Sequence, residues 1–292
     1  MRKTVLSLMS VATLALAGCH SSNSPQQPGQ DGAASSGTSA GVSKVVDEVS
    51  GTISLRAGSP LPSATATLVL NLVDVSASAV GSAPLASSTS PAGTFPQSFK
   101  LTFNPAEVKP NDLYKIQAVL NDGERHYTMP IQAPVLAQGS KNDGVAIELV
   151  AEQTPAEKIL AAFDAQRKLI GGMKVSNGTK LEKDASRGWQ LFRQAGQVEF
   201  IRELVDYGDK GFTSTDYAYK DGKPWAVVQE TKSSRDAKPS AIDRAGWAED
   251  GSLVLKQHQV GGDVQVLGDD TAGKLKRQAM EILSLATGGK NK

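Results

Sequence analysis

Apolar and polar side chains alternate with a period of two along short segments between residues 42 and 150. In the first segment Val49, Ile53 and Leu55 share one face, while mostly polar side chains share the other. This alternation is typical of strands with one buried face. The pattern predicts an antiparallel β-sandwich or barrel, of which we expect the sandwich. The expected strands lie around residues 49–55, 64–72, 99–103, 114–120, 127–131 and 145–149.

Two stretches of this region carry more specific expectations. Asp122-Gly123 can supply the positive φ of a tight hairpin turn, so the chain should reverse there. Tyr127, Met129 and Ile131 should then form the apolar face of the return strand. The serine-rich stretch from residue 76 to residue 90 is expected to be a loop.

A helix is expected directly after the sandwich. Thr154 is a candidate N-cap, Pro155 suits the first helical position, and Glu157 completes a capping box. Apolar residues then recur with helical spacing until Gly171-Gly172 ends the segment. The sequence therefore predicts that a second folded region begins close to residue 151.

Beyond this helix the strand pattern returns. Hairpins are expected around Ala195-Gly196, Asp221-Gly222 and Asp250-Gly251, and a tight turn at Asn177-Gly178-Thr179. Asp269 and the two residues after it can cap a final helix. The apolar face of that helix comprises Leu275, Ala279, Ile282, Leu283 and Ala286. We therefore expect a mainly β protein whose second domain is an α+β antiparallel meander flanked by two helices.

The N-terminal residues have the layout of a secretory signal peptide. Arg2 and Lys3 precede an apolar segment of about a dozen residues, which is too short to span a bilayer. Residues 19–41 carry one charge, Asp31, and too few apolar side chains to offset the entropy of ordering, so they are predicted to be a flexible tether. The predicted organisation is a signal peptide at 1–18, a tether at 19–41, a β-sandwich at 42–150 and an α+β domain at 151–292.

Leu16-Ala17-Gly18-Cys19 resembles a bacterial lipobox. The resemblance implies that the Cys19 thiol receives a diacylglycerol, that the chain is cut before Cys19, and that the new amino terminus is acylated. Two or three acyl chains give lasting membrane attachment, where one chain gives only marginal binding. The residue after Cys19 is His20. In lipoprotein sorting of the enteric type, which this N-terminus resembles, an aspartate at that position would favour retention in the inner membrane. We therefore expect an outer-membrane anchor facing the periplasm, and no other cofactor.

Composition removes several classes of function. The 292 residues carry 31 basic and 30 acidic side chains, without the basic excess of a nucleic-acid binder, so no nucleic-acid partner is expected. Cys19 is the single cysteine of the chain. One thiol excludes an internal disulfide framework and metal sites made of several thiolates.

No group of residues in the sequence meets the requirements of a catalytic site, so we predict that the protein is not an enzyme. His20, His126 and His258 lack the spacing of metal ligands, and no nucleophile elbow or phosphate loop occurs. The alternative is a hydrolase or a calcium site in the second domain. Its acidic cluster comprises Glu199, Glu203, Asp206 and Asp209, with Arg202 and Lys210 between them. Asp206 and Asp209 are weak metal candidates, because the segment lacks the ligand spacing of a calcium loop.

Several short motifs follow one another behind the lipobox. They are Gly51-Thr52-Ile53, Leu61-Pro62, Leu72-Val73-Asp74-Val75-Ser76, Phe95-Pro96, Phe99-x-Leu101-x-Phe103-x-Pro105-Ala106, Tyr114-x-Ile116-x-Ala118 and Asp122-Gly123. In order and spacing this series resembles the YbaY/YscW family of small Gram-negative lipoproteins, over about a third of the chain. The resemblance implies a β-sandwich lipoprotein. One branch of that family serves as pilotins, chaperones that carry a type III secretion secretin to the outer membrane.

These observations predict an outer-membrane lipoprotein with a non-catalytic role in binding, as a chaperone or in envelope maintenance. A secretin pilotin is one alternative, and it would need an exposed apolar groove or sheet edge for its partner. A second alternative is a binder of a small ligand or peptidoglycan. It would present the aromatic residues Tyr207, Tyr217, Tyr219, Trp225 and Trp247. The expected partners are membrane lipid through Cys19 and an envelope protein or secretin subunit.

Overall fold

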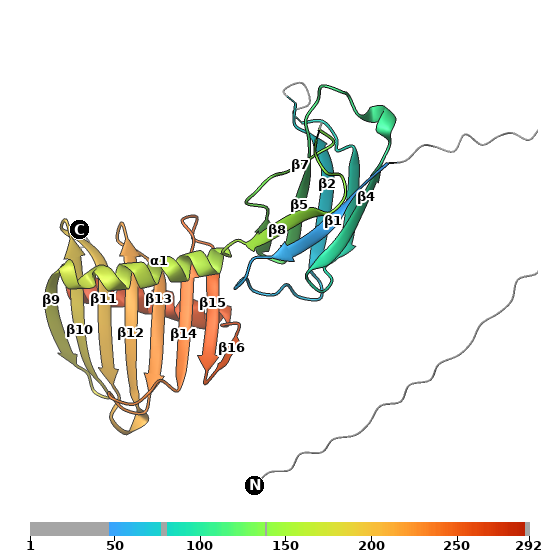
Figure 1. The fold of residues 1–292 in the computed structure, drawn as a ribbon. Coiled ribbons are helices and arrows are strands. Elements are labelled where there is room, and N and C mark those ends of the chain that lie inside the picture. The colour runs from blue at the N-terminus through green and yellow to red at the C-terminus, as the bar shows by residue number, and fades with distance from the viewer. Residues whose placement is uncertain (1–46, 77–80, 138, 290–292) are drawn as a thin grey trace, which may run out of the picture. The chain divides into compact units, whose positions relative to one another are not determined.

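The structure is a computed structural model that describes residues 47–76, 81–137 and 139–289. The predicted signal peptide, the lipobox with Cys19 and the predicted tether lie outside the described residues. The described chain is mainly β, and its strands form two separate sheets (Figure 1). Helices α1 (Pro155–Leu169) and α2 (Asp269–Thr287) pack against the second sheet. The predicted fold class is therefore confirmed.

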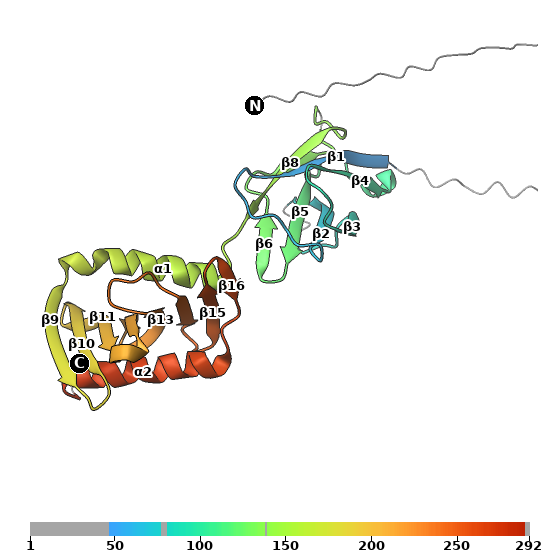
Figure 2. The same cartoon turned by 90° about the horizontal axis from the view of Figure 1, so that it is seen from below.

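The first sheet folds into two layers. Its strands are β1 (Asp47–Leu55), β2 (Thr67–Asp74), β3 (Ala86–Pro91), β4 (Gln97–Phe103), β5 (Tyr114–Asp122), β6 (Arg125–Thr128), β7 (Ala133–Val135) and β8 (Val145–Ala151), and a short 3-10 helix (Pro105–Glu107) follows β4. They run in the order β3-β2-β5-β6-β8-β1-β4, with β7 beside β5. β1, β4 and β8 lie in one layer and the remaining strands in the other, joined where β6 pairs with β8 (Figure 2).

The alternating apolar positions of these strands form one core between the two layers. Val49 and Ile53 of β1 are fully buried, as is Tyr127 of β6. The other members of this core include Leu68, Leu70, Leu72, Phe99, Leu101, Phe103, Ile116, Leu120, Ile147 and Leu149. The period-two pattern therefore predicted the buried face of β1, β2, β4, β5, β6 and β8 correctly.

One strand pair departs from the expected antiparallel arrangement. β1 pairs with β8 in parallel, whereas the other pairs among the described strands are antiparallel. Gly51 lies opposite Val145, and a Cβ atom on Gly51 would stand 1.9 Å from the Val145 carbonyl oxygen. Glycine at this position therefore allows the two backbones to approach. Alternation reports which face is buried and carries no information on strand direction.

Two expectations about the first sheet are wrong. β6 ends at Thr128, and Ile131 is 73% exposed in the connection to β7. The end of the serine-rich stretch is a strand, β3, because Ala86, Ser88 and Ser90 lie opposite the leucines of β2. Hydrophobicity could not reveal a strand whose core-facing side chains are Ala and Ser.

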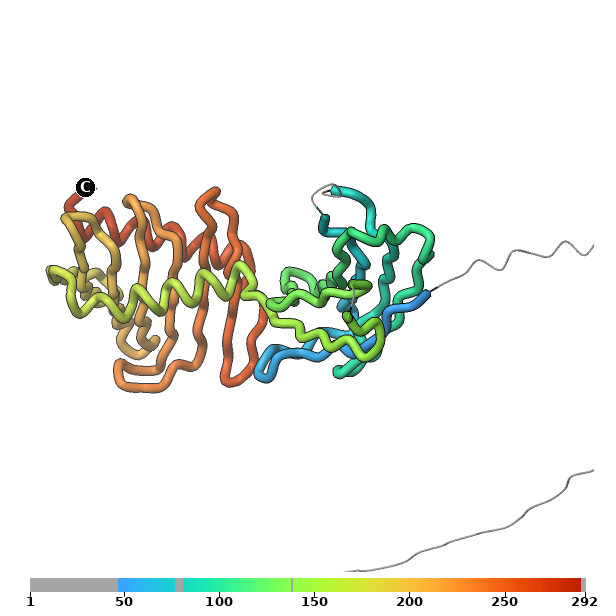
Figure 3. The backbone as a smooth tube through the Cα atoms, turned by 45° about the horizontal axis from the view of Figure 1, so that its top comes forward, coloured from blue at the N-terminus to red at the C-terminus, as the bar shows by residue number. Residues whose placement is uncertain are grey.

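The second sheet is an antiparallel meander in which each strand pairs with the next along the chain (Figure 3). Its strands are β9 (Lys174–Leu181), β10 (Ser186–Gln194), β11 (Gln197–Asp206), β12 (Phe212–Lys220), β13 (Lys223–Lys232), β14 (Ala241–Trp247), β15 (Leu253–Val260) and β16 (Asp263–Gln265). The two helices lie on opposite faces of this sheet (Figure 2). α1 places Phe163 against Phe192 and Phe200, and α2 covers a larger core that includes Leu191 and Tyr217.

Both helices begin and end for local reasons. Thr154 and Glu157 form the predicted capping box at the start of α1, and Gly288 ends α2 with a φ of 63°. The expected cap of α2 at Asp269 is wrong, because the N-cap is Gly268 and no side chain caps this end. Asp269 instead lies in the first turn of α2, where its negative charge interacts favourably with the positive end of the helix dipole. Within the described chain, no helix combines the length and apolarity needed to cross a membrane.

The tight turns of the second sheet were largely predictable. Ala195 and Gly196 have φ values of 50° and 87°, as the predicted two-residue hairpin requires. The turn predicted at Asn177-Gly178-Thr179, in contrast, is wrong, because these residues lie within β9. Gly178 stands opposite Trp189, and a Cβ atom there would be 2.3 Å from the indole ring. This glycine makes room for a neighbouring side chain and does not bend the backbone.

We expect Gly178→Ala to lower the free energy of unfolding by about 1–3 kcal/mol, because the added methyl group overlaps the Trp189 ring. Gly188→Ala is the matched control, since its Cβ atom would meet nothing nearer than 4.0 Å. Urea unfolding followed by tryptophan fluorescence measures both. Equal stability of the two variants would contradict the packing assigned to Gly178.

Candidate functional site

The acidic cluster predicted on β11 does not converge in the structure. Glu203 faces α2, whereas Glu199 faces α1 and accepts a hydrogen bond from Gln166 Nε2 at 3.1 Å. Asp206 and Asp209 are exposed at the turn that follows β11. Glu199 and Glu203 would share a face in a regular strand, but the register between β10 and β11 shifts and leaves Glu199 with no residue opposite it. This bulge turns Glu199 to the face opposite Glu203. The hydrolase hypothesis therefore loses its paired carboxylates.

Glu203 is the most buried member of that cluster, at 3% exposure. It accepts a hydrogen bond from the Tyr217 hydroxyl at 2.6 Å and forms an ion pair with Arg187. Arg187 also lies 3.6 Å from Glu182, which in turn pairs with Lys180 at 3.1 Å. Burial, followed by the Glu203 charge, raises the pKa of the Tyr217 phenol well above its ordinary value. Both Glu203 oxygens are engaged, so this carboxylate supports the fold and faces no substrate.

A second buried carboxylate occupies the opposite face of the sheet. Asp216 on β12 accepts hydrogen bonds from Arg202 at 2.8 and 3.0 Å. Arg167 of α1 adds an ion pair at 3.0 Å. The interleaved cation Arg202 therefore pairs across strands and not with the acids beside it in sequence. This arrangement fastens α1 to the sheet.

The two weak metal candidates lie in a turn. Asp206 Oδ1 accepts a hydrogen bond from the Gly208 amide at 2.9 Å, so this carboxylate caps the turn. Lys210 stands at the end of the same turn. Among the described residues, no three His, Cys, Asp or Glu side chains come together in a way that could hold a metal ion. A shallow open depression beside the turn is lined by residues 181–186 and by Asp206, Tyr207, Gly208 and Lys210.

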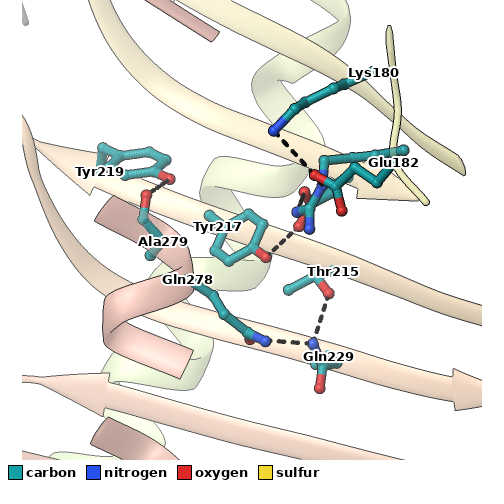
Figure 4. Close-up of polar contacts among 10 residues, drawn as sticks. Lys180, Glu182, Thr215, Tyr217, Tyr219, Gln229, Gln278 and Ala279 are labelled. Atoms are coloured by element: carbon teal, nitrogen blue, oxygen red, sulfur yellow. Dashed lines mark hydrogen bonds and ion pairs between the residues drawn. The ribbon is translucent and has the colours of Figure 1, made fainter. Parts of the chain in front are cut away.

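The aromatic residues proposed to bind a ligand are mostly core residues. Tyr217 and Tyr219 are fully buried, and Trp247 is 7% exposed, beneath α2. Tyr219 donates a hydrogen bond to the Ala279 carbonyl at 2.7 Å (Figure 4). Trp225 packs edge-on against Phe163. Of the five aromatic residues, Tyr207 in the turn is the exposed one. The expectation that these five side chains present one binding surface is therefore wrong.

The register of the second sheet creates a polar row that sequence reasoning missed. His258, Asp243, Gln229, Thr215 and Glu203 lie directly opposite one another on five successive strands. His258 Nδ1 is 2.5 Å from Asp243 Oδ1, and Gln229 donates to Thr215 at 3.1 Å. Gln229 also contacts Gln278 of α2 (Figure 4). The available signal was the polar member of each alternating strand, but its alignment depends on the register.

Among the described residues, β3 and β4 end the strand order of the first sheet and each pairs with one other strand, while the three-residue β7 pairs with β5 alone. β4 carries Lys100, which pairs with Glu48 at 3.2 Å, whereas β3 carries no charged residue. Outward-facing Ser87 and Thr89 of β3 are exposed. An edge strand presents unpaired backbone donors and acceptors to any extended chain. The free edge of β3 is therefore the candidate partner-binding surface of this sheet.

Comparison with known proteins connects the first sheet to a class of chaperones. Residues 44–148 match the family described as type III secretion system lipoprotein chaperone (YscW). A solved structure titled as an alternative pilotin from the type II secretion system of Vibrio cholerae is 17% identical. It covers 37% of this chain and 99% of its own, with a TM-score of 0.34. No curated protein matches this chain.

The matched segment contains most of the first sheet and ends before the second. The resemblance seen in the sequence is thus confirmed for YscW, while the YbaY name is not. Within 44–148 the chain is similar to lipoprotein chaperones of secretion systems. The second sheet and its helices lie outside this match.

We expect Glu203→Ala to lower the free energy of unfolding by about 2–4 kcal/mol, because it leaves Arg187 and the Tyr217 hydroxyl without their partner. Asp209→Ala is the control, since an exposed turn residue should change stability by less than about 0.5 kcal/mol. Chemical denaturation of both variants tests this. An unchanged Glu203→Ala would show that the carboxylate has no structural role.

We also expect stability to fall as the pH rises above about 10. The pKa of Tyr217 is raised by burial in the folded chain, so the unfolded chain releases the phenol proton first and gains free energy from doing so. Tyr217→Phe should reduce this alkaline loss of stability. The measurement is urea unfolding at pH 8, 10 and 11, and parallel slopes for the variant and wild type would contradict the burial of this phenol.

Proposed function

We propose that this protein is a lipid-anchored chaperone of the pilotin type, whose first domain binds a secretin subunit in the cell envelope. The observation that carries the proposal is the match of residues 44–148 to the YscW lipoprotein chaperones. This match favours the pilotin alternative over a general role in envelope maintenance. A binding role needs no catalytic group, which is consistent with the engaged carboxylates of the second sheet.

The proposal assigns a role to each part of the chain. Residues 1–18 direct export, Cys19 carries the acyl chains, and residues 19–41 link the anchor to the folded domains at 42–150 and 151–292. A flexible chain of some 20 residues has a root-mean-square span of about 25 Å. That span lets a periplasmic domain collect its partner while it stays attached to the outer membrane.

The choice of the outer membrane rests on His20 at the position that sorts lipoproteins. A pilotin that delivers a secretin must end at the membrane where the secretin assembles. Anchor and partner binding are therefore separable, since Cys19 lies outside the matched segment.

The test is affinity purification of the natively lipidated protein after in-cell crosslinking, in cells that express a secretin subunit. We expect the secretin subunit to co-purify and to fractionate with the outer membrane. In a Cys19→Ala strain the subunit should still co-purify but leave the outer-membrane fraction. Ser22→Ala, a change in the predicted tether, is the matched control.

Two outcomes would contradict this function. One is that no secretin subunit co-purifies with the wild-type protein. The other is that the subunit reaches the outer membrane equally well in the Cys19→Ala strain, because a pilotin acts through its anchor.

A further inference from the structure

The free edge of β3 has the properties of a binding site for an extended polypeptide. We infer that this edge takes an uncharged strand of the secretin partner, which extends the first sheet by backbone hydrogen bonds. The inference rests on the proposed function and adds to it the place and the manner of binding.

The register of β2 and β3 determines which backbone groups of β3 are free. The Ala92 amide donates to the Ala66 carbonyl at 2.8 Å, and these two residues lie one position beyond the Thr67–Pro91 pair that ends the ladder. Hydrogen-bonded pairs alternate along an antiparallel ladder, so Ala86, Ser88 and Ser90 direct their backbone groups to β2. The amide and carbonyl groups of Ser87 and Thr89 consequently point away from the sheet.

The same register explains why Pro91 ends this edge. Pro91 has the parity of Ser87 and Thr89, so its missing N–H would point outward and costs no bond to β2. The free edge therefore offers two complete donor and acceptor pairs, at Ser87 and Thr89. A partner strand of about five residues can use both.

Charge and length together distinguish β3 from the other described strands that have a partner on one side only. β4 carries Lys100, β9 carries Lys174 and Lys180, and β16 contains Asp263. Charged side chains and short length protect edge strands from pairing with other chains, and β16 has only three residues. β3 has six residues, Ala-Ser-Ser-Thr-Ser-Pro, and none of them is charged. β7 is also uncharged, but it has only three residues, so β3 is the one of these described edges that lacks both kinds of protection.

The side chains of β3 indicate what the partner must carry. Ser87 and Thr89 are exposed, so partner residues opposite them face water and are polar. Ala86, Ser88 and Ser90 are small and half-buried beside the leucines of β2. Partner residues opposite these positions lie over the rim of the core and are apolar. The occupant is thus an uncharged segment with alternating apolar and polar residues.

The test uses full-length lipidated protein and a secretin subunit expressed in the same cells. Thr89→Pro removes one outward N–H and leaves the bonds to β2 in place, whereas Thr89→Val keeps that N–H and serves as the matched control. We expect Thr89→Pro to reduce recovery of the secretin subunit at least tenfold, and Thr89→Val to recover it as the wild type does. Thr89→Lys, which places a charge on the edge, should act like Thr89→Pro.

Each other outcome separates the edge from the proposed function. Failure of the wild-type protein to recover the subunit overturns the function itself. Equal recovery by wild type, Thr89→Pro and Thr89→Lys overturns the edge inference and leaves the function standing. A dimer of this chain that Thr89→Pro abolishes, with secretin recovery unchanged, would show that a second copy occupies the edge. Urea unfolding checks that Thr89→Pro folds, and Thr89→Lys decides if it does not.

Discussion

The strands of both sheets must pair their backbone amide and carbonyl groups with neighbouring strands. Every interior strand needs a partner on both sides, and every sheet that does not close leaves two ends. In the second sheet those ends are β9, which carries lysines, and the three-residue β16. In the first sheet they are β4, with its charged pair, and the uncharged β3. Charge and length at these four ends distinguish edges that resist pairing with other chains from an edge that can accept another strand.

The second sheet shows how buried charges can serve a fold without serving catalysis. Glu203 and Asp216 lie on neighbouring strands but on opposite faces, each paired with arginine. Breaking such a pair leaves an uncompensated charge, which makes each partner depend on the other. Asp216 holds α1 through Arg167, and Gln229 contacts α2 through Gln278. Polar side chains thus add to the apolar contacts by which the helices lie on the two faces.

The two sheets of the described chain differ in what they offer a binding partner. Most of the first sheet lies within a segment similar to secretion lipoprotein chaperones, and among the described residues this sheet has the free edge that partner binding by strand addition requires. The second sheet has its aromatic residues in the core and its carboxylates engaged in ion pairs. The pilotin proposal therefore rests on the first domain and on the anchor expected at Cys19.

Six of the eight described strands of the first sheet (β1, β2, β4, β5, β6 and β8) could be predicted from the sequence alone, as could the capping box of α1, the hairpin at Ala195-Gly196 and the apolar face of α2. Each of these depends on neighbouring residues, through side-chain alternation, capping or a local φ angle. Tertiary structure decided the parallel pairing of β1 with β8, the existence of β3 and the place of Gly178 opposite Trp189. It also decided the polar row from Glu203 to His258, because strand register joins residues far apart in sequence. A pattern along one chain contains the period of each strand, but direction, register and free edges exist only once the strands have met.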